Sequence, residues 1–343
     1  MAAAGMLTIA DVTGDAVIGG SEALARVPAL YRAFRRLARA LRGESRPHVL
    51  VVVDFPEFNL RLARVARRAG VPVVYFVPPQ VWAWRPWRAR AIARDVTRVL
   101  AAFPFEVDLY LAAGARVEFV GHPIVDDLAD APTREDARRR LGLEVAVAPV
   151  LGLLPGSRRH EVERLLPAMA EAGAEVARRF PGARFVLGRA PTVTSSEIQR
   201  HVGGMIDVTE GATHDVIAAA DLVLAASGTV TLEAALLGTP MIVCYRVSAT
   251  TELMGRLLMR IPWVSLANIT LGRAVVPELL QRDATGPVIG REAVRLLDDP
   301  DALAVQRGAF KELAGRFGEP GVGLRAARAV LDVSRAGRSR PLT

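Results

Sequence analysis

The sequence predicts an α/β protein built from two tandem domains, each with a parallel β-sheet covered by helices. Short runs of β-branched residues alternate with helical segments in two separate series, a pattern typical of βαβ units. The chain has 343 residues, of which 51% are hydrophobic, so it can bury two cores. A polar stretch at residues 126–140, interrupted by Pro132, separates the two series. We therefore expect an N-terminal Rossmann-like domain over residues 1–140 and a C-terminal one over residues 141–343.

The first series opens with an amphipathic helix predicted over residues 21–42. Its apolar residues, from Leu24 to Leu41, recur at steps of three and four, and arginines occupy much of the remaining surface. Such a helix either packs against a core or lies on a membrane surface, and packing is the more common use. Strands are expected over residues 48–54, 71–77, 96–103 and 116–120, with helices over 60–69 and about 85–95 and a short helix before the last strand.

The second series begins with a strand over residues 150–154 and a long helix over 161–180. Further strands are expected over residues 184–187, 205–208, 222–226, 241–246 and 263–266, with helices between them, and the sequence is helical again from about 288 to 336. Two Rossmann-like halves in tandem suggest the GT-B arrangement, in which the two halves face each other across a cleft.

The charge balance indicates anionic partners. The formal net charge is +8, and Lys311 is the only lysine, so nearly every positive charge is a guanidinium. Arginine matches phosphate oxygens with a planar fork of donors, which makes anionic lipids, nucleotide sugars and nucleic acids all candidates. No known nucleic-acid module is visible, and the basic residues are dispersed. The histidines are too scattered for a metal site, Cys244 has no partner cysteine, and no run approaches the roughly 18 apolar residues of a membrane span.

The strongest local motif is LPGSRR at residues 154–159, where an apolar strand turns directly into a helix. Free N–H groups and the positive end of the helix suit a diphosphate, and Gly156 allows close approach of the backbone. Ser157 and Arg158 can supply further donors. An ordinary strand-to-helix turn with a surface arginine explains the same residues, so this motif alone leaves both interpretations open.

A second motif, ASGTVTLE at residues 226–233, again joins a strand end to a helix. Ser227 and Thr229 can cap that helix, while Gly228 permits close ligand approach. Glu233 lies in the first turns, where its carboxylate could accept hydrogen bonds from the two hydroxyls of a ribose. A carboxylate near a helix N-terminus often only stabilises the helix dipole, so this interpretation depends on the other motifs.

The first domain offers a carboxylate at a strand end, Asp54. Transfer of a sugar to an alcohol needs a base within reach of the attacking hydroxyl, and Asp54 can serve; a helix-capping role has equal weight. The segment 78–88 holds three of the four tryptophans beside arginines, which suits a membrane interface, a sugar platform, a stacked base or plain core. His122 follows another strand end, where it either orients substrate or has a structural role.

With these segments in hand, the sequence resembles the lipid A disaccharide synthase family from about Ala3 to the C-terminal helices. The motifs that carry the resemblance are DFPEFN (54–59), PQVWAWR (79–85), FVGHP (119–123), LPGSR (154–158), SGT with TLE (227–229 and 231–233), and VSLAN with GR and PELLQ (264–268, 272–273 and 277–281). The resemblance implies an inverting hexosyltransferase of GT-B fold. Such an enzyme transfers 2,3-diacylglucosamine from UDP-2,3-diacylglucosamine to the 6-hydroxyl of 2,3-diacylglucosamine 1-phosphate, forming the β-1',6 disaccharide of lipid A and UDP.

The resemblance also carries expectations about the site and the setting. Asp54 becomes the candidate general base, Arg158 neutralises the leaving diphosphate and Glu233 holds the ribose. The donor site is expected to comprise Gly156, Ser157, Arg158, Ser227, Gly228, Thr229, Glu233 and Asn268, with further substrate contacts at Glu57, Gln80, Trp82, Trp84, His122 and Arg273. No metal, organic cofactor or nucleic acid is expected. The family further implies a peripheral location on the anionic surface at the cytoplasmic face of the inner membrane, and its members can form homodimers.

The front of the chain departs from the family pattern. The family begins with a strand and a Gly-rich acidic motif, which DVTGD at residues 11–15 matches only superficially. We therefore expect the first βαβ unit to be missing and the strand over residues 48–54 to lie at an open sheet edge. Two alternatives to an active glycosyltransferase follow. One is an N-terminally truncated, non-catalytic homologue that binds nucleotide sugars; the other is a non-hydrolysing UDP-sugar epimerase on the same fold, against which the motif set argues.

Overall fold

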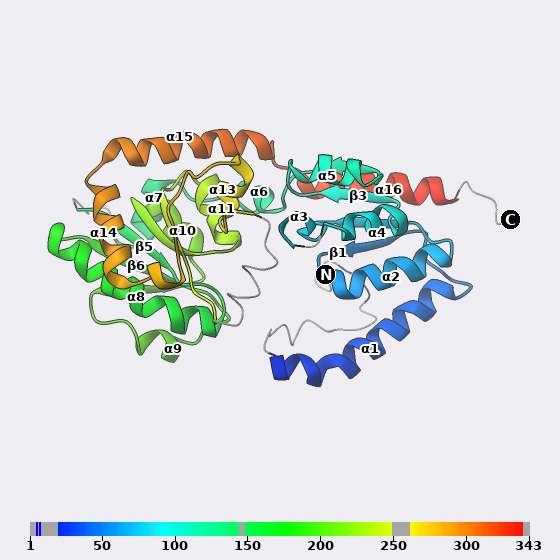
Figure 1. The fold of residues 1–343 in the computed structure, drawn as a ribbon, viewed down its shortest axis with the longest axis horizontal. Helices are drawn as coiled ribbons and strands as arrows, with labels where there is room; N and C mark the ends of the chain where they lie inside the picture. The colour runs from blue at the N-terminus through cyan, green and yellow to red at the C-terminus, as the bar shows by residue number, and fades with distance from the viewer. Residues whose placement is uncertain are drawn as a thin grey trace. The chain divides into compact units, whose positions relative to one another are not determined.

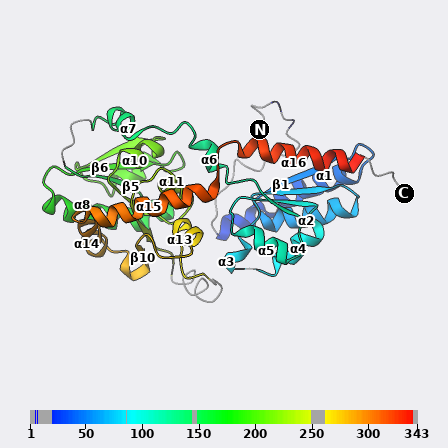
Figure 2. The ribbon, with the colours of Figure 1, turned by 90° about the horizontal axis from the view of Figure 1, so that it is seen from above.

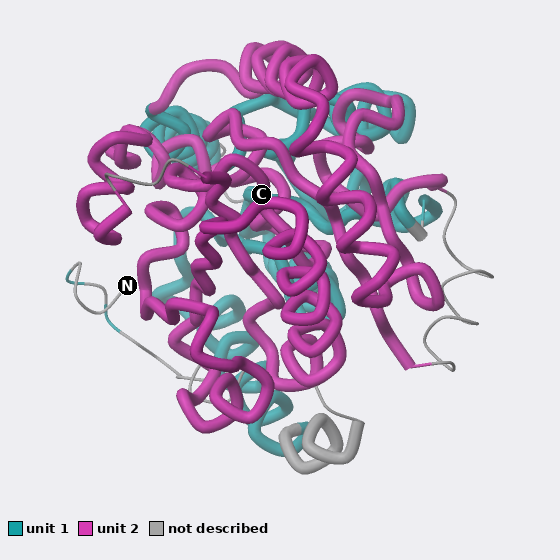
Figure 3. The backbone as a smooth tube through the Cα atoms, turned by 90° about the vertical axis from the view of Figure 1, so that its left-hand side faces the viewer, with its two compact units in different colours: residues 1–122, 321–343 teal, residues 123–320 magenta. Residues whose placement is uncertain are grey.

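The computed structural model describes residues 5, 7, 20–84, 86–143, 148–248 and 261–338. The chain divides into two compact units, which Figure 3 colours separately. Unit 1 comprises residues Met1–His122 together with Gly321–Thr343, and unit 2 comprises Pro123–Pro320. Each unit holds one sheet, and all strand pairs among the described residues are parallel. The predicted α/β class with two parallel, Rossmann-like sheets is confirmed.

The sheet of unit 1 is formed, in the described residues, by four parallel strands in the order β1-β2-β3-β4. These are β1 (Leu50–Val53), β2 (Val73–Phe76), β3 (Arg98–Ala101) and β4 (Val117–Phe119). Among the described strands, β1 stands at one end of this order, and Val51 and Val53 are exposed. The inner strands β2 and β3 are almost wholly buried, which explains their continuous apolar sequence.

The helices of unit 1 cover this sheet (Figure 1). They are α1 (Gly20–Arg42), α2 (Pro56–Arg68), α3 (Val81–Trp84), α4 (Arg88–Asp95), α5 (Glu106–Ala112) and α16 (Val322–Arg338). The C-terminal half of α1 packs inward through Ala38 and Leu41, and the Phe34 ring meets Phe58 of α2 edge to face, with centroids 5.8 Å apart. This packing favours the core interpretation of the predicted amphipathic helix, although Tyr31 stays exposed.

Unit 2 contains, within its described residues, a six-stranded parallel sheet in the order β10-β9-β8-β5-β6-β7. Its strands are β5 (Val150–Leu154), β6 (Arg184–Arg189), β7 (Ile206–Glu210), β8 (Leu222–Ala226), β9 (Met241–Tyr245) and β10 (Glu278–Leu280). This is the doubly wound order, which starts in the middle of the sheet and runs outward in both directions. The order reverses between the neighbouring central strands β5 and β8, which are fully buried.

The helices of unit 2 lie on both sides of its sheet (Figure 1). They are α6 (Ile124–Asp127), α7 (Arg134–Arg140), α8 (Arg159–Arg179), α9 (Ser195–Gln199), α10 (Thr213–Ala219), α11 (Thr229–Leu236), α13 (Leu266–Leu271), α14 (Gly286–Leu297) and α15 (Pro300–Phe317), with a 3₁₀ turn at Gln281–Asp283. Helices α8 and α14 pack closely. The side chains of Glu171 and Glu175 on α8 lie against Gly286 and Gly290 of α14, where a Cβ atom would clash with them.

The units divide the chain differently from the predicted boundary at residue 140. Helix α7 lies in the stretch predicted as a linker and belongs to unit 2, since Arg134 and Arg138 both form ion pairs with Asp221. At the other end, α16 returns to unit 1 and packs beside β2 (Figure 2). There, Arg325 Nε donates to Val120 O over 3.0 Å. Ion pairs and hydrogen bonds between distant residues decide this grouping, and local sequence does not reveal them.

The predicted strand over residues 263–266 is wrong. Ser265 instead caps helix α13, because its side chain accepts a hydrogen bond from Asn268 N. The sixth strand of the sheet is β10, and its Glu278 carboxylate accepts hydrogen bonds from Val264 N at 2.8 Å and Ser265 N at 3.0 Å. The apolar run of residues 263–266 therefore leads into helix α13. It lies beside β10, a strand that the sequence did not predict.

Candidate functional site

The two strand-to-helix motifs of unit 2 lie next to each other. LPGSR follows β5, SGT follows β8, and these strands are parallel neighbours with Leu154 paired to Ala225. Their carboxyl ends therefore meet at one edge of the sheet, at the point where the strand order reverses. In open α/β sheets this is the place where ligands bind.

Both motifs line one cavity of about 690 Å³. Seven of the eight residues predicted for the donor site face it: Gly156, Ser157, Arg158, Ser227, Gly228, Thr229 and Glu233. The cavity also takes in residues for which no role was predicted, among them Asp127 of α6, Arg140 of α7 and His214 of α10. Small residues at Gly188, Ala190 and Gly211 complete the wall beside β6 and β7.

A carboxylate occupies two N–H groups just before the start of α8. Glu161 Oε2 accepts hydrogen bonds from Ser157 N at 3.1 Å and Arg158 N at 3.2 Å. Its other oxygen, Oε1, accepts from Arg158 Nη1 at 2.8 Å. Glu161 thus occupies N–H groups that the sequence interpretation assigned to a diphosphate. The side chain also lies close over Gly156, where a Cβ atom would come within 2.4 Å of Glu161 Oε2.

The start of α11 is open by contrast. Ser227 does not cap the helix as predicted, because its hydroxyl donates to Val264 O at 2.9 Å. Thr231 Oγ1 donates back to Gly228 O at 2.8 Å. Within the described part of the chain, no acceptor is paired with the N–H groups of Gly228, Thr229 or Val230. Three unpaired N–H groups at a helix start favour an anion.

Glu233 lies behind this helix start, and its side chain is only 16% exposed. Burial raises the pKa of its carboxyl group, the nearby charge of His214 lowers it, and Asp127 raises it again. His214 Nε2 lies 3.5 Å from Glu233 Oε2. The cavity wall therefore includes the guanidinium of Arg158 and the largely buried carboxylate of Glu233. The charge of this carboxylate depends on His214 and Asp127.

In unit 1, the backbone at the predicted general base is held in a conformation that side chains rarely adopt. Asp54 and Phe55 have φ values of 45° and 38°, in the left-handed region. Asn59 Nδ2 donates to Val53 O at 2.9 Å and to Asp54 O at 2.7 Å, and Tyr75 Oη also donates to Asp54 O at 2.7 Å. Strained backbone that its surroundings fix in this way clusters at functional sites.

Asp54 has charged neighbours in the same unit. Glu57, a predicted substrate contact, pairs with Arg88 at 2.8 Å. Burial raises the pKa of the Tyr75 hydroxyl, and the charges of Asp54 and Glu57 raise it further. The phenol therefore stays protonated, which keeps it a donor to the Asp54 backbone.

In the aromatic segment of unit 1, Trp82 packs against neighbouring side chains, whereas Trp87 is exposed. The Trp82 indole N–H donates to Glu106 Oε1 at 3.0 Å, and its ring packs edge to face against Phe105. The His122 ring lies 5.2 Å from that of Phe103. Gln80 is exposed, whereas the side chain of Trp84 falls outside the described residues, as do residues 11–15. Substrate contacts by these residues remain predictions.

Asn268 and Arg273 are not brought to the cavity. Asn268 is buried, and its Nδ2 donates to Val276 O and Glu278 Oε1 while its Oδ1 accepts from Val275 N and Val276 N. The amide is thus fully used in holding the turn between α13 and β10. Arg273 pairs with Glu312 of α15 on an exposed face. Neither residue lines the cavity that holds the other donor-site residues.

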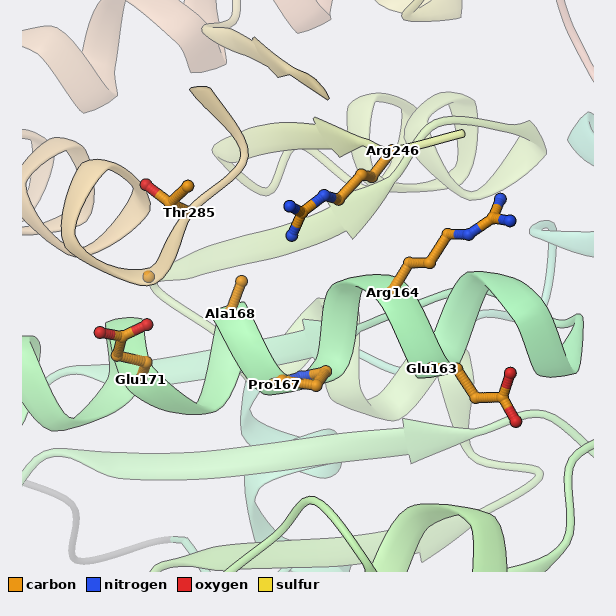
Figure 4. A pocket seen from close by; sticks show the side chains of 8 residues that line it. Glu163, Arg164, Pro167, Ala168, Glu171, Arg246 and Thr285 are labelled. Carbon is orange, nitrogen blue, oxygen red and sulfur yellow. The ribbon is translucent and has the colours of Figure 1, made fainter. Parts of the chain in front are cut away.

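A second cavity of unit 2, about 420 Å³ in volume, lies between α8, the end of β9 and the start of α14. Figure 4 shows Arg164 and Arg246 in its wall, with the two guanidinium groups directed away from each other. Glu171 adds an opposite charge. Since its cations do not converge, this cavity lacks the features of a diphosphate site. Within the described ranges, no three His, Cys, Asp or Glu side chains gather as a metal-binding group.

The fold and this edge of the sheet define the class of the protein: two parallel Rossmann-type sheets of the kind found in GT-B glycosyltransferases and related epimerases. Solved structures agree on the fold. The S. aureus MnaA–UDP structure matches with a TM-score of 0.62 at 12% identity, over 92% of this chain and 83% of that one. UDP-GlcNAc 2-epimerase from Neisseria meningitidis, bound to UDP-GlcNAc, matches with a TM-score of 0.59 at 14% identity, over 88% and 82%. At such low identity the likeness shows the fold alone.

Sequence comparison identifies the family. The profile of the family described as lipid-A-disaccharide synthetase matches residues 1–315. The lipid-A-disaccharide synthase of Syntrophotalea carbinolica is 42% identical over 323 residues, covering 93% of this chain and 82% of that protein. That of Myxococcus xanthus is 41% identical over 341 residues, covering 98% and 88%. The chain belongs to the lipid-A-disaccharide synthetase family, a family of glycosyltransferases.

Proposed function

We propose that this chain transfers 2,3-diacylglucosamine from UDP-2,3-diacylglucosamine to 2,3-diacylglucosamine 1-phosphate and releases UDP. The observation that carries the proposal is the convergence of Gly156–Arg158 and Ser227–Glu233 around one cavity at the switch point of the unit 2 sheet. Family membership selects the substrates. The diphosphate is placed at the start of α11 beside Arg158, and the ribose at Glu233.

In the proposed reaction Asp54 is the general base. Its carboxylate accepts the proton of the acceptor's 6-hydroxyl as the oxygen attacks C1 of the donor sugar. The bond from O6 to C1 forms while the bond from C1 to the UDP oxygen breaks, which inverts the configuration and gives the β-1',6 linkage. Both electrons of the broken bond leave with UDP, whose developing charge is stabilised by Arg158 and the N–H groups of α11. No metal ion or cofactor takes part in the proposal.

The test is to incubate the purified chain with both substrates and to follow UDP release together with the disaccharide product. Equal amounts of UDP and disaccharide support the proposal. Binding of UDP without turnover supports a non-catalytic homologue instead. Conversion of a UDP-sugar without acceptor supports an epimerase. UDP must be measured with and without the acceptor, because hydrolysis of the donor also releases it.

We further propose that the chain works at the cytoplasmic surface of the inner membrane, held peripherally. None of the helices among the described residues has the length and apolar character needed to cross a membrane. Acylated substrates reside in a bilayer, and a net charge of +8 favours an anionic surface. Co-sedimentation with vesicles tests this: binding should require anionic lipid and weaken at high salt, and equal binding to neutral vesicles contradicts it.

A further inference from the structure

The side chain of Glu161 is the one group in the cavity wall that touches both the first motif's backbone and its arginine. Its two oxygens accept hydrogen bonds from Ser157 N, Arg158 N and Arg158 Nη1, at 2.8 to 3.2 Å. The Glu161 side chain is 18% exposed, whereas that of Arg158 is 55% exposed. A largely shielded carboxylate therefore holds an exposed guanidinium in place.

An exposed arginine that lacks such a partner samples many rotamers, and ordering it on a ligand costs free energy. Glu161 removes part of that cost before any ligand arrives. A guanidinium has five N–H donors, and Glu161 takes only one from Arg158. The remaining donors are available to an anion in the cavity that Arg158 lines.

The same contacts occupy the N–H groups of Ser157 and Arg158, just before the first residue of α8. The start of α11 keeps the N–H groups of Gly228 and Thr229 unpaired in the described chain. A diphosphate in the cavity then has two sources of hydrogen bonds: the free N–H groups of Arg158 and the N-terminus of α11. The N–H groups of Ser157 and Arg158 are not among these sources, because Glu161 occupies them.

We propose that Glu161 is a positioning residue for the nucleotide diphosphate: it fixes Arg158 toward the cavity and occupies the N–H groups of Ser157 and Arg158. The inference rests on the proposed UDP-sugar site. It differs from the alternative in which Glu161 occupies the place of a phosphate and must be displaced by it. The two alternatives predict changes of opposite sign when Glu161 is removed.

A double-mutant cycle on UDP affinity separates them, measured by titration calorimetry on wild type, Glu161→Ala, Arg158→Ala and the double variant. We expect each single variant to bind UDP about tenfold more weakly. The double variant should bind no more weakly than Arg158→Ala, because Glu161 acts through Arg158. Glu161→Gln keeps the side-chain length and an acceptor oxygen, so it preserves folding and should give a smaller loss.

Glu197 provides a matched control. Its carboxylate caps α9 in the same manner, accepting from Thr194 N and Thr194 Oγ1 at 2.8 Å, but it does not line the cavity. Glu197→Ala should lower the melting temperature, as Glu161→Ala does, and leave UDP affinity unchanged. Equal or tighter UDP binding by Glu161→Ala overturns the inference alone. Failure of the wild-type protein to bind UDP contradicts the proposed function and the inference together.

Discussion

His214 Nε2 lies 3.5 Å from Glu233 Oε2, on the wall of the cavity where the two motifs of unit 2 meet. The two residues come from α10 and α11, and Asp127 of α6 is near enough to act on the same carboxyl group. Burial raises the pKa of Glu233, His214 opposes this rise and Asp127 adds to it. The charge of the proposed ribose-binding carboxylate is therefore set by three separate helices.

This arrangement predicts a pH dependence of UDP binding. Glu233 must be ionised to accept hydrogen bonds from both ribose hydroxyls, and its raised pKa means that it protonates at a higher pH than an ordinary glutamate. UDP affinity should therefore fall as pH decreases through the pKa of Glu233. His214→Gln removes the opposing charge and should move this fall to higher pH, weakening binding about threefold at pH 6.

Asp127→Asn is the paired variant, because it removes the charge that raises the pKa of Glu233. Its loss of UDP affinity should begin at lower pH than in the wild type. Arg140 and Asp215, which pair with each other at the cavity, and Arg158 with Glu161 remain unchanged in both variants. Titration calorimetry between pH 5 and 8 checks the prediction. Shifts of the same sign in both variants would rule out Glu233 as the titrating group.

Replacement of Asp54 should separate catalysis from donor binding. Asp54→Asn keeps the shape of the side chain but removes its basicity, so turnover should fall by about 100-fold or more. UDP affinity should stay the same, since the proposed UDP contacts all lie in unit 2. Steady-state rates of disaccharide formation and calorimetric UDP affinity measure the two effects. Turnover equal to that of wild type removes Asp54 from the mechanism.

Arg158 and Arg159 form a matched pair for the diphosphate contact. Both lie at the start of α8 and both pair with a glutamate, but only Arg158 lines the cavity. Arg158→Ala should lower UDP affinity about tenfold, whereas Arg159→Ala should leave it unchanged. Weaker UDP binding in both variants points to a general loss of positive charge, and no effect of Arg158→Ala refutes its phosphate role.

Most strands and the two motifs of unit 2 could be predicted from local sequence, because each is a contiguous pattern. The sequence predicted that residues 156–158 and 227–233 meet, and the register of β5 with β8 brings both to one cavity. His214 was missed because one polar residue on a helix has no pattern of its own. Glu161 was missed as well, because an arginine at the N-cap position does not give the Ser/Thr-x-x-Glu signature of a capping box.

Two of the predicted site residues, Asn268 and Trp82, have hydrogen-bond partners that only the fold reveals. Asn268 lies in one of the motifs that carry the family resemblance, yet its amide is fully used by the turn that follows α13. Trp82 lies beside arginines in sequence, but its indole N–H donates to the buried carboxylate of Glu106 in α5. In both cases the side chain is held by hydrogen-bond partners outside its own helix.

That buried carboxylate, Glu106, predicts a pH dependence of stability. Burial raises the pKa of Glu106 to about 7, opposed by hydrogen bonds from Trp82 and the backbone. A carboxyl whose pKa is raised on folding stabilises the protein fully below its unfolded pKa, near 4.5, and loses that contribution as pH rises through about 7. The free energy of unfolding should therefore drop by about 3 kcal/mol between pH 5 and 8 from this residue.

Glu106→Gln should flatten this dependence, since glutamine stays neutral and keeps an acceptor for the Trp82 N–H. Chemical denaturation followed by tryptophan fluorescence is a suitable measurement, because three of the four tryptophans lie in unit 1. Asp108→Asn, on the same helix, changes a carboxylate outside the buried set and serves as the control. Equal pH dependence in wild type and Glu106→Gln would show that Glu106 is not the titrating group.

The backbone at Asp54 predicts an effect of residues that never touch substrate in the proposed mechanism. Asn59 and Tyr75 hold the left-handed conformation of Asp54 and Phe55 through hydrogen bonds to the carbonyl groups of Val53 and Asp54. Left-handed φ values cost about 1–3 kcal/mol for residues other than glycine, so the segment should relax when these bonds are lost. The Asp54 carboxylate then leaves its working position.

Asn59→Ala, and separately Tyr75→Phe, should therefore lower turnover by about tenfold to 100-fold with UDP affinity unchanged. Asn59→Asp is a sharper variant, because it keeps the size of the side chain but cannot donate, and it should lose as much activity as Asn59→Ala. Combining either change with Asp54→Asn should add little, since both act through the same carboxylate. Fully additive losses would mean that Asn59 and Tyr75 support the fold of unit 1 and not the position of Asp54.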